Sequence, residues 1–254
     1  MTKSKESQSG IINKTNYCLN NGVHPRYWFQ HKKISLVIPC FNEEEGIQKI
    51  LERKPLFIDE VIVVDNNSTD KTSKMAKKLG AKVIFEKRRG YGQAYLAGFE
   101  VADGDIFVTM DGDSSYPVRE ISKLVDFLLD KRADFVSGCR FPLQEKQSMR
   151  SLNRFGNFML TLVFFIVTFR KIRDSQSGMW VFRREILDKI KLVSNGMAFS
   201  EEIKMEVMFN KDIVFAEVPI SYSVRLGEVK LNKFRDGFAN LFFLFKKRID
   251  LISR

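Results

Sequence analysis

The sequence predicts an α/β fold in which a mostly parallel sheet is flanked by helices. Three observations lead to it. Short β-branched runs recur every 20 to 27 residues in the first half of the chain. One helical pattern separates each run from the next, which is typical of βαβ units and a parallel sheet. The 254 residues, 44% of them hydrophobic, suffice to bury a core.

The first half of the chain alternates between strand and helix patterns. Strands are expected at Ile34–Ile38, Val61–Asp65, Val83–Phe85, Ile106–Met110 and Asp134–Ser137. Helices are expected at Glu44–Arg53, Asp70–Leu79, Tyr91–Val101 and Val118–Lys131. Residues 1–32 form a polar lead-in without periodicity, so we expect the folded domain to occupy residues 33–254.

The chain changes character after Arg140. A basic loop reaches Arg150, and apolar helices are expected at 155–169 and 232–248. The remaining strands are expected at Gly178–Phe182 and Ile213–Val218, and the remaining helices at Arg183–Ile190 and Ser200–Asn210. The C-terminal third therefore adds aromatic, amphipathic segments to the α/β plan.

Positive charge is concentrated in three zones. The chain has 42 Lys+Arg and 31 Asp+Glu, a net charge of +11. Residues 1–33, 140–173 and 225–254 together carry +16, which leaves −5 for the rest. Localised positive charge suggests an anionic partner, such as nucleic acid, phosphate groups or a membrane surface. For any single cluster, simple solubility is the alternative explanation.

The cysteines and the apolar stretches indicate the redox state of the protein's compartment and its relation to a membrane. Cys18, Cys40 and Cys139 are widely spaced and form no CxxC, so neither a disulfide nor a cysteine metal site is expected, and a reducing compartment fits. No signal peptide is recognised at the N-terminus. The uncharged stretch 155–169 would extend only ~22 Å as a helix, short of a ~30 Å hydrocarbon core. We therefore expect residues 155–169 and 232–248 to lie in a membrane surface, in its plane or half-inserted, and not to span it. Core packing or an oligomer contact is the alternative for each segment.

Polar segments follow three of the predicted strands. Pro39–Glu43, Asp65–Asp70 and Asp111–Ser115 stand at strand ends, where ligands bind in open α/β sheets. Ser68 or Asp70 is expected to cap the following helix, which would leave Asp65 free to face the crevice.

The Asp111-Gly112-Asp113 motif is the sharpest chemical signal. Residues i and i+2 of an extended segment lie on the same side, so the two carboxylates repel each other unless a cation or separate donors stabilise them. Mg²⁺ and Mn²⁺ prefer such oxygen ligands and commonly bridge to a diphosphate. Gly112 allows close approach of a ligand. A solvated Asp-Gly turn is the alternative.

Several segments in order resemble family 2 glycosyltransferases of the GT-A fold, and more narrowly the dolichyl/polyprenyl-phosphate mannose and glucose synthases. The resemblance covers about residues 33–248. Besides the three strand-end segments, it is carried by Arg89–Gly92, Gly138–Phe141, Asp174–Gly178, Glu217–Ile220 and Arg225–Leu231. A GT-A fold, with a mostly parallel sheet flanked by helices, is what this resemblance implies.

The resemblance also implies roles for particular residues. Those of the nucleotide-sugar site would be Pro39, Phe41, Glu43, Asp65, Asn67, Gly112, Arg225 and Lys230. Asp111, Asp113 and Ser115 would hold Mg²⁺ or Mn²⁺, and Asp111, Asp113 and Arg140 would be catalytic. Arg140, Arg150 and Ser177 would face the acceptor phosphate. The chain departs from the family at Asn66, Ser115 and Val229, where Asp, Gln and Ser or Thr are usual, which leaves the donor sugar open among UDP-glucose, UDP-N-acetylglucosamine and GDP-mannose.

The reaction that follows is a metal-dependent, inverting hexosyl transfer. A phosphate-monoester acceptor is largely dianionic at pH 7 and needs no side-chain base, which fits a chain whose only histidines, His24 and His31, fall in the lead-in. The expected acceptor is a dolichyl or polyprenyl phosphate, and the expected location is the cytoplasmic face of a membrane. The alternatives are a glycosyltransferase with a soluble or glycan acceptor and, less favoured, a basic nucleic-acid-binding module, since the aromatic residues cluster and do not alternate with Lys/Arg. No nucleic-acid partner is therefore expected, and the oligomeric state stays open.

Overall fold

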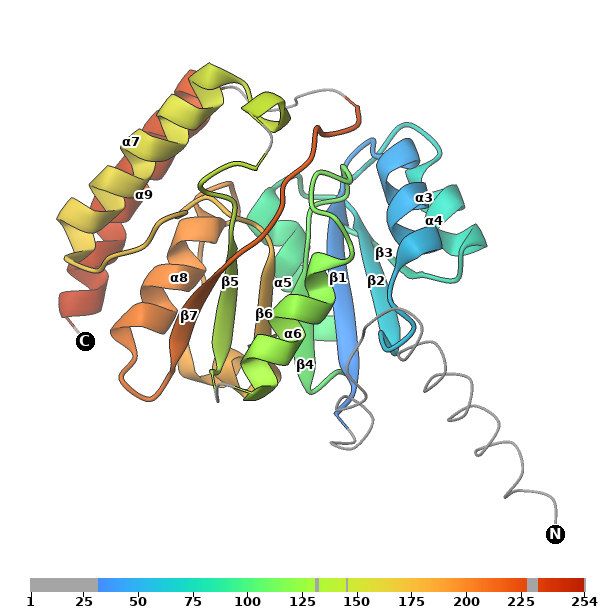
Figure 1. Ribbon diagram of the computed structural model, residues 1–254, viewed down its shortest axis with the longest axis horizontal. Helices are drawn as coiled ribbons and strands as arrows, with labels where there is room; N and C mark the ends of the chain where they lie inside the picture. Colours follow the sequence, from blue (N-terminus) through green and yellow to red (C-terminus); the bar gives the residue numbers. More distant parts are fainter. Residues whose placement is uncertain (1–31, 131–132, 145, 228–232, 254) are drawn as a thin grey trace, which may run out of the picture.

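A seven-stranded mixed sheet organises the chain (Figure 1). The computed structural model describes residues 32–130, 133–144, 146–227 and 233–253. The strands are β1 (Ile34–Cys40), β2 (Glu60–Asp65), β3 (Lys82–Phe85), β4 (Ile106–Thr109), β5 (Phe135–Cys139), β6 (Trp180–Arg183) and β7 (Phe215–Pro219). Their order is β3-β2-β1-β4-β6-β5-β7, and β6 runs antiparallel to both neighbours while the other pairs are parallel. The predicted mostly parallel sheet is confirmed.

Helices cover both faces of this sheet. They are α3 (Glu44–Arg53), α4 (Thr72–Lys78), α5 (Tyr91–Val101), α6 (Glu120–Asp130), α7 (Ser151–Thr168), α8 (Phe199–Phe209) and α9 (Lys233–Ile252). The helix expected at Arg183–Ile190 is a 3-10 helix, η2 (Arg184–Lys189), and a short η1 covers Lys146–Ser148. The predicted elements are present, with boundaries that shift by a few residues.

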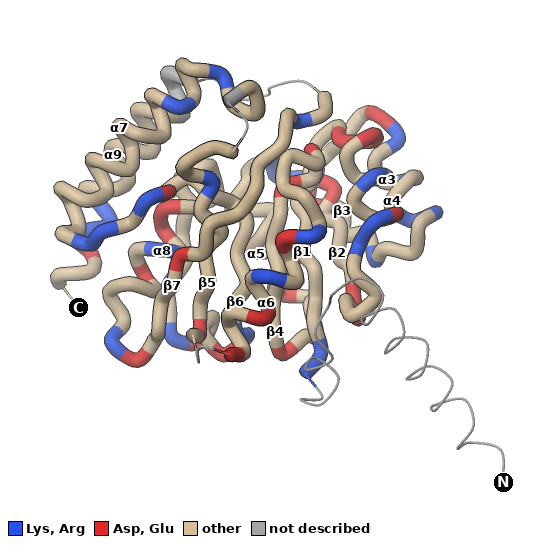
Figure 2. Tube along the Cα trace, in the orientation of Figure 1, with Lys and Arg blue, Asp and Glu red and all other residues tan. Residues whose placement is uncertain are grey.

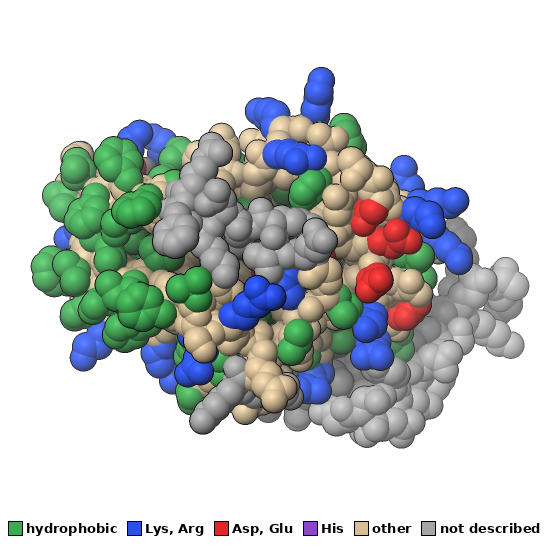
Figure 3. Space-filling model, turned by 90° about the horizontal axis from the view of Figure 1, so that it is seen from above, with side chains coloured by type: hydrophobic (Ala, Val, Ile, Leu, Met, Phe, Trp, Pro, Cys, Tyr) green, Lys and Arg blue, Asp and Glu red, His purple; other side chains and the backbone are tan. Residues whose placement is uncertain are grey.

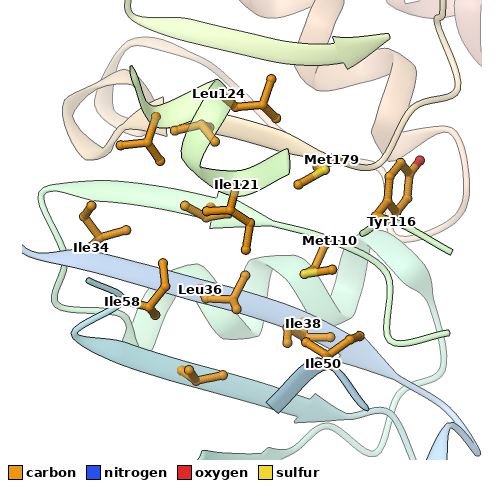
Figure 4. Close-up of a cluster of buried hydrophobic side chains, with 14 of the residues drawn as sticks. Ile34, Leu36, Ile38, Ile50, Ile58, Met110, Tyr116, Ile121, Leu124 and Met179 are labelled. Carbon is orange, nitrogen blue, oxygen red and sulfur yellow. The ribbon is translucent and has the colours of Figure 1, made fainter. Parts of the chain in front are cut away.

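Alternate side chains of each strand belong to two different core clusters, one on each face of the sheet. On β1, Leu36 and Ile38 pack under α3 and α6 (Figure 4), whereas Val37 points to the other face, under α5. Alternate side chains of a strand point to opposite faces, so a strand buried on both sides is apolar throughout. The second face is rich in packed aromatic rings, among them the stacked pair Tyr95 and Phe199, whose centroids lie 5.8 Å apart. These two layers hold the strand ends in fixed positions.

Helices α7 and α9 lie side by side at one end of the molecule (Figure 1). Phe164 and Val167 of α7 pack with Leu244 of α9 and Met205 of α8 in a third apolar cluster. At 18 residues α7 is longer than its uncharged stretch, and among the described helices it alone has the length and composition to cross a membrane. The prediction that no segment is long enough to cross a membrane is wrong on this point, because the helix begins four residues earlier, at Ser151.

A buried ammonium group fastens α9 to α8. Lys247 is 3% exposed, and its Nζ lies 2.8 Å from Glu202 Oε1 and also pairs with Glu206. The same Nζ donates a hydrogen bond to the Lys191 carbonyl. Glu202 in turn accepts hydrogen bonds from the backbone amides of Val193 and Ser194. Breaking such a buried pair by removing one partner costs about 3–5 kcal/mol, so α9 is firmly attached.

Candidate active site

The carboxyl ends of β1, β2 and β4 meet at one edge of the sheet. Asp65 ends β2, but it is not free as expected: its carboxylate accepts hydrogen bonds from the Ser68 amide and the Ser73 hydroxyl. Asp70 accepts one from the amide of Thr72, the first residue of α4, but the N-cap position is Lys71 and has no side-chain cap, so the cap expected at Ser68 or Asp70 is not formed. The segment is a turn built from its own side chains, and Asn67 sits in it at φ +67°.

Asn66 ties a neighbouring loop to this edge. Its side-chain amide donates hydrogen bonds to the carbonyls of Glu86 (3.0 Å) and Arg88 (2.7 Å), and its oxygen accepts one from the Gly90 amide (2.8 Å). An Asp side chain has no donor for the two carbonyls. The departure from the Asp usual at position 66 therefore has a structural reason. The same loop places Arg89 over the ring of Phe41, 4.1 Å from its centroid.

The Asp111–Asp113 loop is held from several sides. Asp113 accepts hydrogen bonds from the amide (2.9 Å) and the hydroxyl (2.6 Å) of Ser115. Gly112 admits no side chain, because a Cβ there would stand 2.6 Å from Cys40 Sγ. Burial and the negative charge of Asp113 raise the pKa of Asp111 to about 7. Asp113 is buried and Asp111 half-buried, so this turn is not the solvated one that was the alternative.

Tyr91, the first residue of α5, reaches the same loop. Its hydroxyl donates a 2.9 Å hydrogen bond to Asp111 Oδ1. A Cβ at Gly178 would stand 2.3 Å from the Tyr91 oxygen and 3.0 Å from Asp111 Oδ1, so only glycine fits. Burial raises the pKa of Tyr91 well above its ordinary value, which keeps it a donor. Sequence reasoning placed Tyr91 in a motif without giving it a role.

The segment after β7 closes over the acidic loop. The amides of Ser223 and Leu226 donate to the carbonyls of Ser115 and Asp113. This pairing brings the Arg225 guanidinium 3.3 Å from Glu43 Oε1 and 3.5 Å from Asp113 Oδ2. The structure thus brings together the predicted residues of β1, β4 and the C-terminal segment. Lys230, predicted beside them, lies outside the described residues, as does Val229.

Arg140, at the end of β5, is held by a partner that sequence reasoning did not pair with it. Its Nε and Nη2 lie 2.7 and 2.8 Å from the two carboxylate oxygens of Asp174, and the residue is 6% exposed. Burial alone would raise the pKa of Asp174, but the guanidinium holds it below its ordinary value. Ser177, predicted to face an acceptor, is fully buried in the same loop.

An open pocket lies beside these residues at the start of α7. It has a volume of about 400 Å³ and is lined by Phe141, Ser151, Arg154, Phe155 and Phe158. The start of a helix presents unpaired amides, which favour anions. Arg150, the predicted acceptor residue, precedes α7 and is exposed. The pocket combines one cation with three aromatic rings.

The acidic loop fits a divalent ion only in part. No group of three His, Cys, Asp or Glu side chains gathers anywhere in the described ranges. Asp111 and Asp113 supply hard oxygen ligands of the kind that Mg²⁺ and Mn²⁺ prefer. Burial and the Asp113 charge raise the pKa of Asp111, and the positive charges of Arg140 and Arg225 offset this only in part. The two carboxylates would therefore fit a divalent metal ion only if it took its other ligands from elsewhere, such as a diphosphate.

Helices α7 and α9 present an apolar surface next to this site. Its exposed members are Leu152, Phe155, Phe158, Met159, Leu162, Phe165, Ile166, Phe169, Phe238, Phe242, Phe245, Ile249 and Ile252. We call this surface the apolar plate. Figure 3 shows apolar side chains gathered at this end of the molecule, and Figure 2 shows Lys and Arg at both ends of the helix pair. Large contiguous apolar patches on a protein surface mark sites that bind another protein, a membrane or a ligand.

The mixed sheet, with a paired-Asp loop at its edge and arginines around it, defines a glycosyltransferase with the GT-A fold. The chain belongs to glycosyl transferase family 2, because the model of that family matches residues 35–191.

The chain is similar to sugar-transferring proteins of Haloferax volcanii and Pyrococcus furiosus. It is 34% identical to a low-salt glycan biosynthesis hexosyltransferase of Haloferax volcanii, over 83% of this chain and 52% of the relative. It is 34% identical to a dolichyl-phosphate hexose transferase of the same organism, over 81% and 90%. It is 29% identical to a dolichol-phosphate mannosyltransferase of Pyrococcus furiosus, over 78% and 59%. The chain thus spans about half of the first relative, and the resemblance to dolichyl-phosphate sugar synthases is confirmed.

Solved structures confirm the fold. Glucosyl-3-phosphoglycerate synthase from Mycobacterium tuberculosis, in complex with Mn²⁺, UDP and phosphoglyceric acid, matches with a TM-score of 0.67 at 22% identity, over 87% of this chain and 79% of that chain. Its complex with Mg²⁺ and UDP matches with a TM-score of 0.69 at 21% identity, over 88% and 80%.

Proposed function

We propose that this glycosyltransferase moves a hexose from a nucleotide sugar to a dolichyl or polyprenyl phosphate at a membrane surface, with Mg²⁺ or Mn²⁺. The observation that carries the proposal is the apolar plate, rimmed by basic residues, beside a site with paired acids. A soluble acceptor gives no reason to expose Phe238 and Phe242 to the extent of 70% and 73%. The relatives named for dolichyl-phosphate transfer support the same acceptor.

Each part of the site has a task in this proposal. Asp111 and Asp113 would hold the metal, which when bound neutralises charge on the leaving diphosphate. Arg225, fixed between Glu43 and Asp113, would orient that diphosphate, since a guanidinium matches phosphate oxygens with two donors. Phe41, under Arg89, would border the nucleotide.

The acceptor would approach from the plate. Its phosphate would meet Arg154 and the start of α7, and its isoprenoid chain would follow Phe155 and Phe158 out of the pocket. The guanidinium of Arg140 is paired with Asp174, so it would act on the acceptor phosphate mainly through its positive charge and less through a direct hydrogen bond. The phosphate oxygen needs no general base, because its second pKa lies near 6.

The donor and metal assignments are tested together. UDP-glucose, UDP-N-acetylglucosamine and GDP-mannose are screened with Mn²⁺ by thermal shift, since a ligand that binds only the folded protein raises its melting temperature. The sugar that binds is then supplied with a short-chain polyprenyl phosphate. Asp113→Ala should abolish transfer and the Mn²⁺-dependent shift, whereas Asp188→Ala, an exposed carboxylate, should change neither. Full activity of Asp113→Ala would refute the metal assignment.

The membrane assignment has its own test. The double variant Phe238→Ser, Phe242→Ser should lose at least about tenfold in partition to anionic liposomes, because each fully buried Phe contributes roughly 1.5–3 kcal/mol. Phe85→Ser is the matched control, because Phe85 is 62% exposed on β3, at the other edge of the sheet. A wild-type protein that ignores liposomes but glycosylates a soluble acceptor would support the alternative acceptor class.

A further inference from the structure

The loop of residues 174–178 forms one wall of the acidic site. Its last residue, Gly178, sits against the Tyr91 hydroxyl and Asp111, where a Cβ would clash. The Gly178 amide donates a 2.9 Å hydrogen bond to the Tyr116 hydroxyl. The position of this wall decides how close an incoming group comes to Asp111.

One buried side chain makes three hydrogen bonds to that loop from behind, whereas Trp180, Glu217 and Thr161 make one backbone hydrogen bond each to it. Lys204, in the middle of α8, is 0% exposed. Its Nζ donates to the carbonyls of Asp174 (3.3 Å), Ser175 (2.8 Å) and Ser177 (2.7 Å). Three carbonyl acceptors match the three donors of an ammonium group and exceed the two of a neutral amine. The full set of three hydrogen bonds therefore requires the charged form of Lys204.

The same loop determines the position of Arg140. Asp174 accepts two hydrogen bonds from the guanidinium and a third from the Arg140 backbone amide. Movement of the Asp174 backbone would therefore move the guanidinium as well. Lys204 thus supports the loop that borders Asp111 and, through Asp174, the position of Arg140, which follows β5.

The surroundings of Lys204 are charged but closed to water. The charged and titratable groups around its ammonium are Asp174 and Arg140, Glu217 on β7, and Glu201 on α8, and the Trp180 ring lies 5.6 Å from Nζ. Burial, the largest influence, lowers the pKa of Lys204 to about 8. Burial also raises the pKa of Glu201 to about 8. Neither group lies within the paired-acid loop.

We propose that Lys204 is a positioning residue, whose ammonium holds residues 174–178 against Asp111 and thereby sets the place of the acceptor phosphate relative to the donor. The inference rests on the proposed transfer to a phosphate acceptor. It assigns Lys204 no contact with substrate: the residue acts through the carbonyls that it holds and through the Asp174–Arg140 pair.

Kinetics of Lys204→Met provide the first test, with Lys211→Met, an exposed lysine just after α8, as control. Transfer to a short-chain polyprenyl phosphate should fall about tenfold or more in kcat/KM for the acceptor, the effect of losing a charged hydrogen-bond donor. The KM for the nucleotide sugar and the thermal shift with UDP or GDP plus Mn²⁺ should stay within about threefold and a few degrees of wild type. A folded Lys204→Met with wild-type acceptor kinetics would overturn the proposal.

A pH profile of the wild-type protein provides the second test and does not depend on the folding of Lys204→Met. Wild-type acceptor kcat/KM should decline reversibly above about pH 8 as Lys204 loses its proton, while nucleotide binding persists. Glu201→Gln should keep this decline, at the same or a lower pH, because the Glu201 charge only raises the pKa of Lys204. No decline up to pH 9.5, or a decline that disappears in Glu201→Gln, would overturn the assignment.

The two failures are distinguishable. If wild-type protein binds a nucleotide sugar but transfers nothing to polyprenyl phosphate, the proposed acceptor is wrong. If wild-type protein transfers and Lys204→Met transfers equally well, only the role of Lys204 is wrong.

Discussion

The Tyr91 hydroxyl donates a 2.9 Å hydrogen bond to Asp111 Oδ1. Tyr91→Phe removes that bond and leaves the ring in place. A hydrogen bond to a charged group contributes about 1.5–3 kcal/mol, so we expect the Mn²⁺ concentration for half-maximal thermal shift to rise about tenfold. Titration of Mn²⁺ at fixed nucleotide measures it. An unchanged midpoint would mean that Asp111 is oriented without Tyr91.

Arg225 joins Glu43 and Asp113 across the site. Arg225→Met keeps much of the side-chain volume and removes the two-donor fork. The KM for the nucleotide sugar should rise at least about tenfold, in line with the loss of a charge-assisted bond to phosphate. Arg184→Met, an exposed arginine on η2, should leave KM unchanged. Equal effects of the two variants would argue against a diphosphate clamp.

Asn66 supports the loop that leads to α5. Asn66→Asp replaces two amide donors by a carboxylate that faces the carbonyls of Glu86 and Arg88. The free energy of unfolding should fall by about 2 kcal/mol, the cost of leaving buried acceptors unpaired. The urea midpoint at pH 7 measures the loss. A midpoint equal to wild type would show that the loop is held by other contacts.

Glu201 makes stability depend on pH. Its pKa is raised by burial from 4.5 to about 8, so between these values the folded protein binds a proton that the unfolded chain releases, and stability falls as pH rises through that window. Glu201→Gln removes this dependence. Its melting temperature should exceed that of wild type by several degrees at pH 8–9, with the gap narrowing toward pH 5. Glu185→Gln, on the exposed surface of η2, should follow the wild-type curve.

The polar segments at the strand ends could be located from the sequence because each follows directly on an apolar, strand-like run. Asp111 and Asp113 follow an apolar run, and the edge of a parallel sheet brings them near Glu43. The direction of β6 was beyond such reasoning, since a strand of four apolar-rich residues has no feature that distinguishes parallel from antiparallel pairing.

The missed contacts are those made over long sequence separations. Arg140 and Asp174 are 34 residues apart, and no periodicity pairs them. Lys204 lies among charged residues on a helix, a pattern typical of an exposed face, yet it is fully buried. One missed contact is local instead: Asp65 was expected to be free once Ser68 or Asp70 capped the helix, but the Ser68 amide and the Ser73 hydroxyl both donate to its carboxylate.

The attachment of α9 through Lys247 also bears on the order in which the chain folds during synthesis. Glu202 and Glu206 leave the ribosome some forty residues before the lysine that neutralises them. Until Lys247 follows, α8 would bury two carboxylates without their cation, at a cost of several kcal/mol. The nascent chain can therefore assemble its sheet early, but the layer that contains α8 becomes stable only when the last helix arrives.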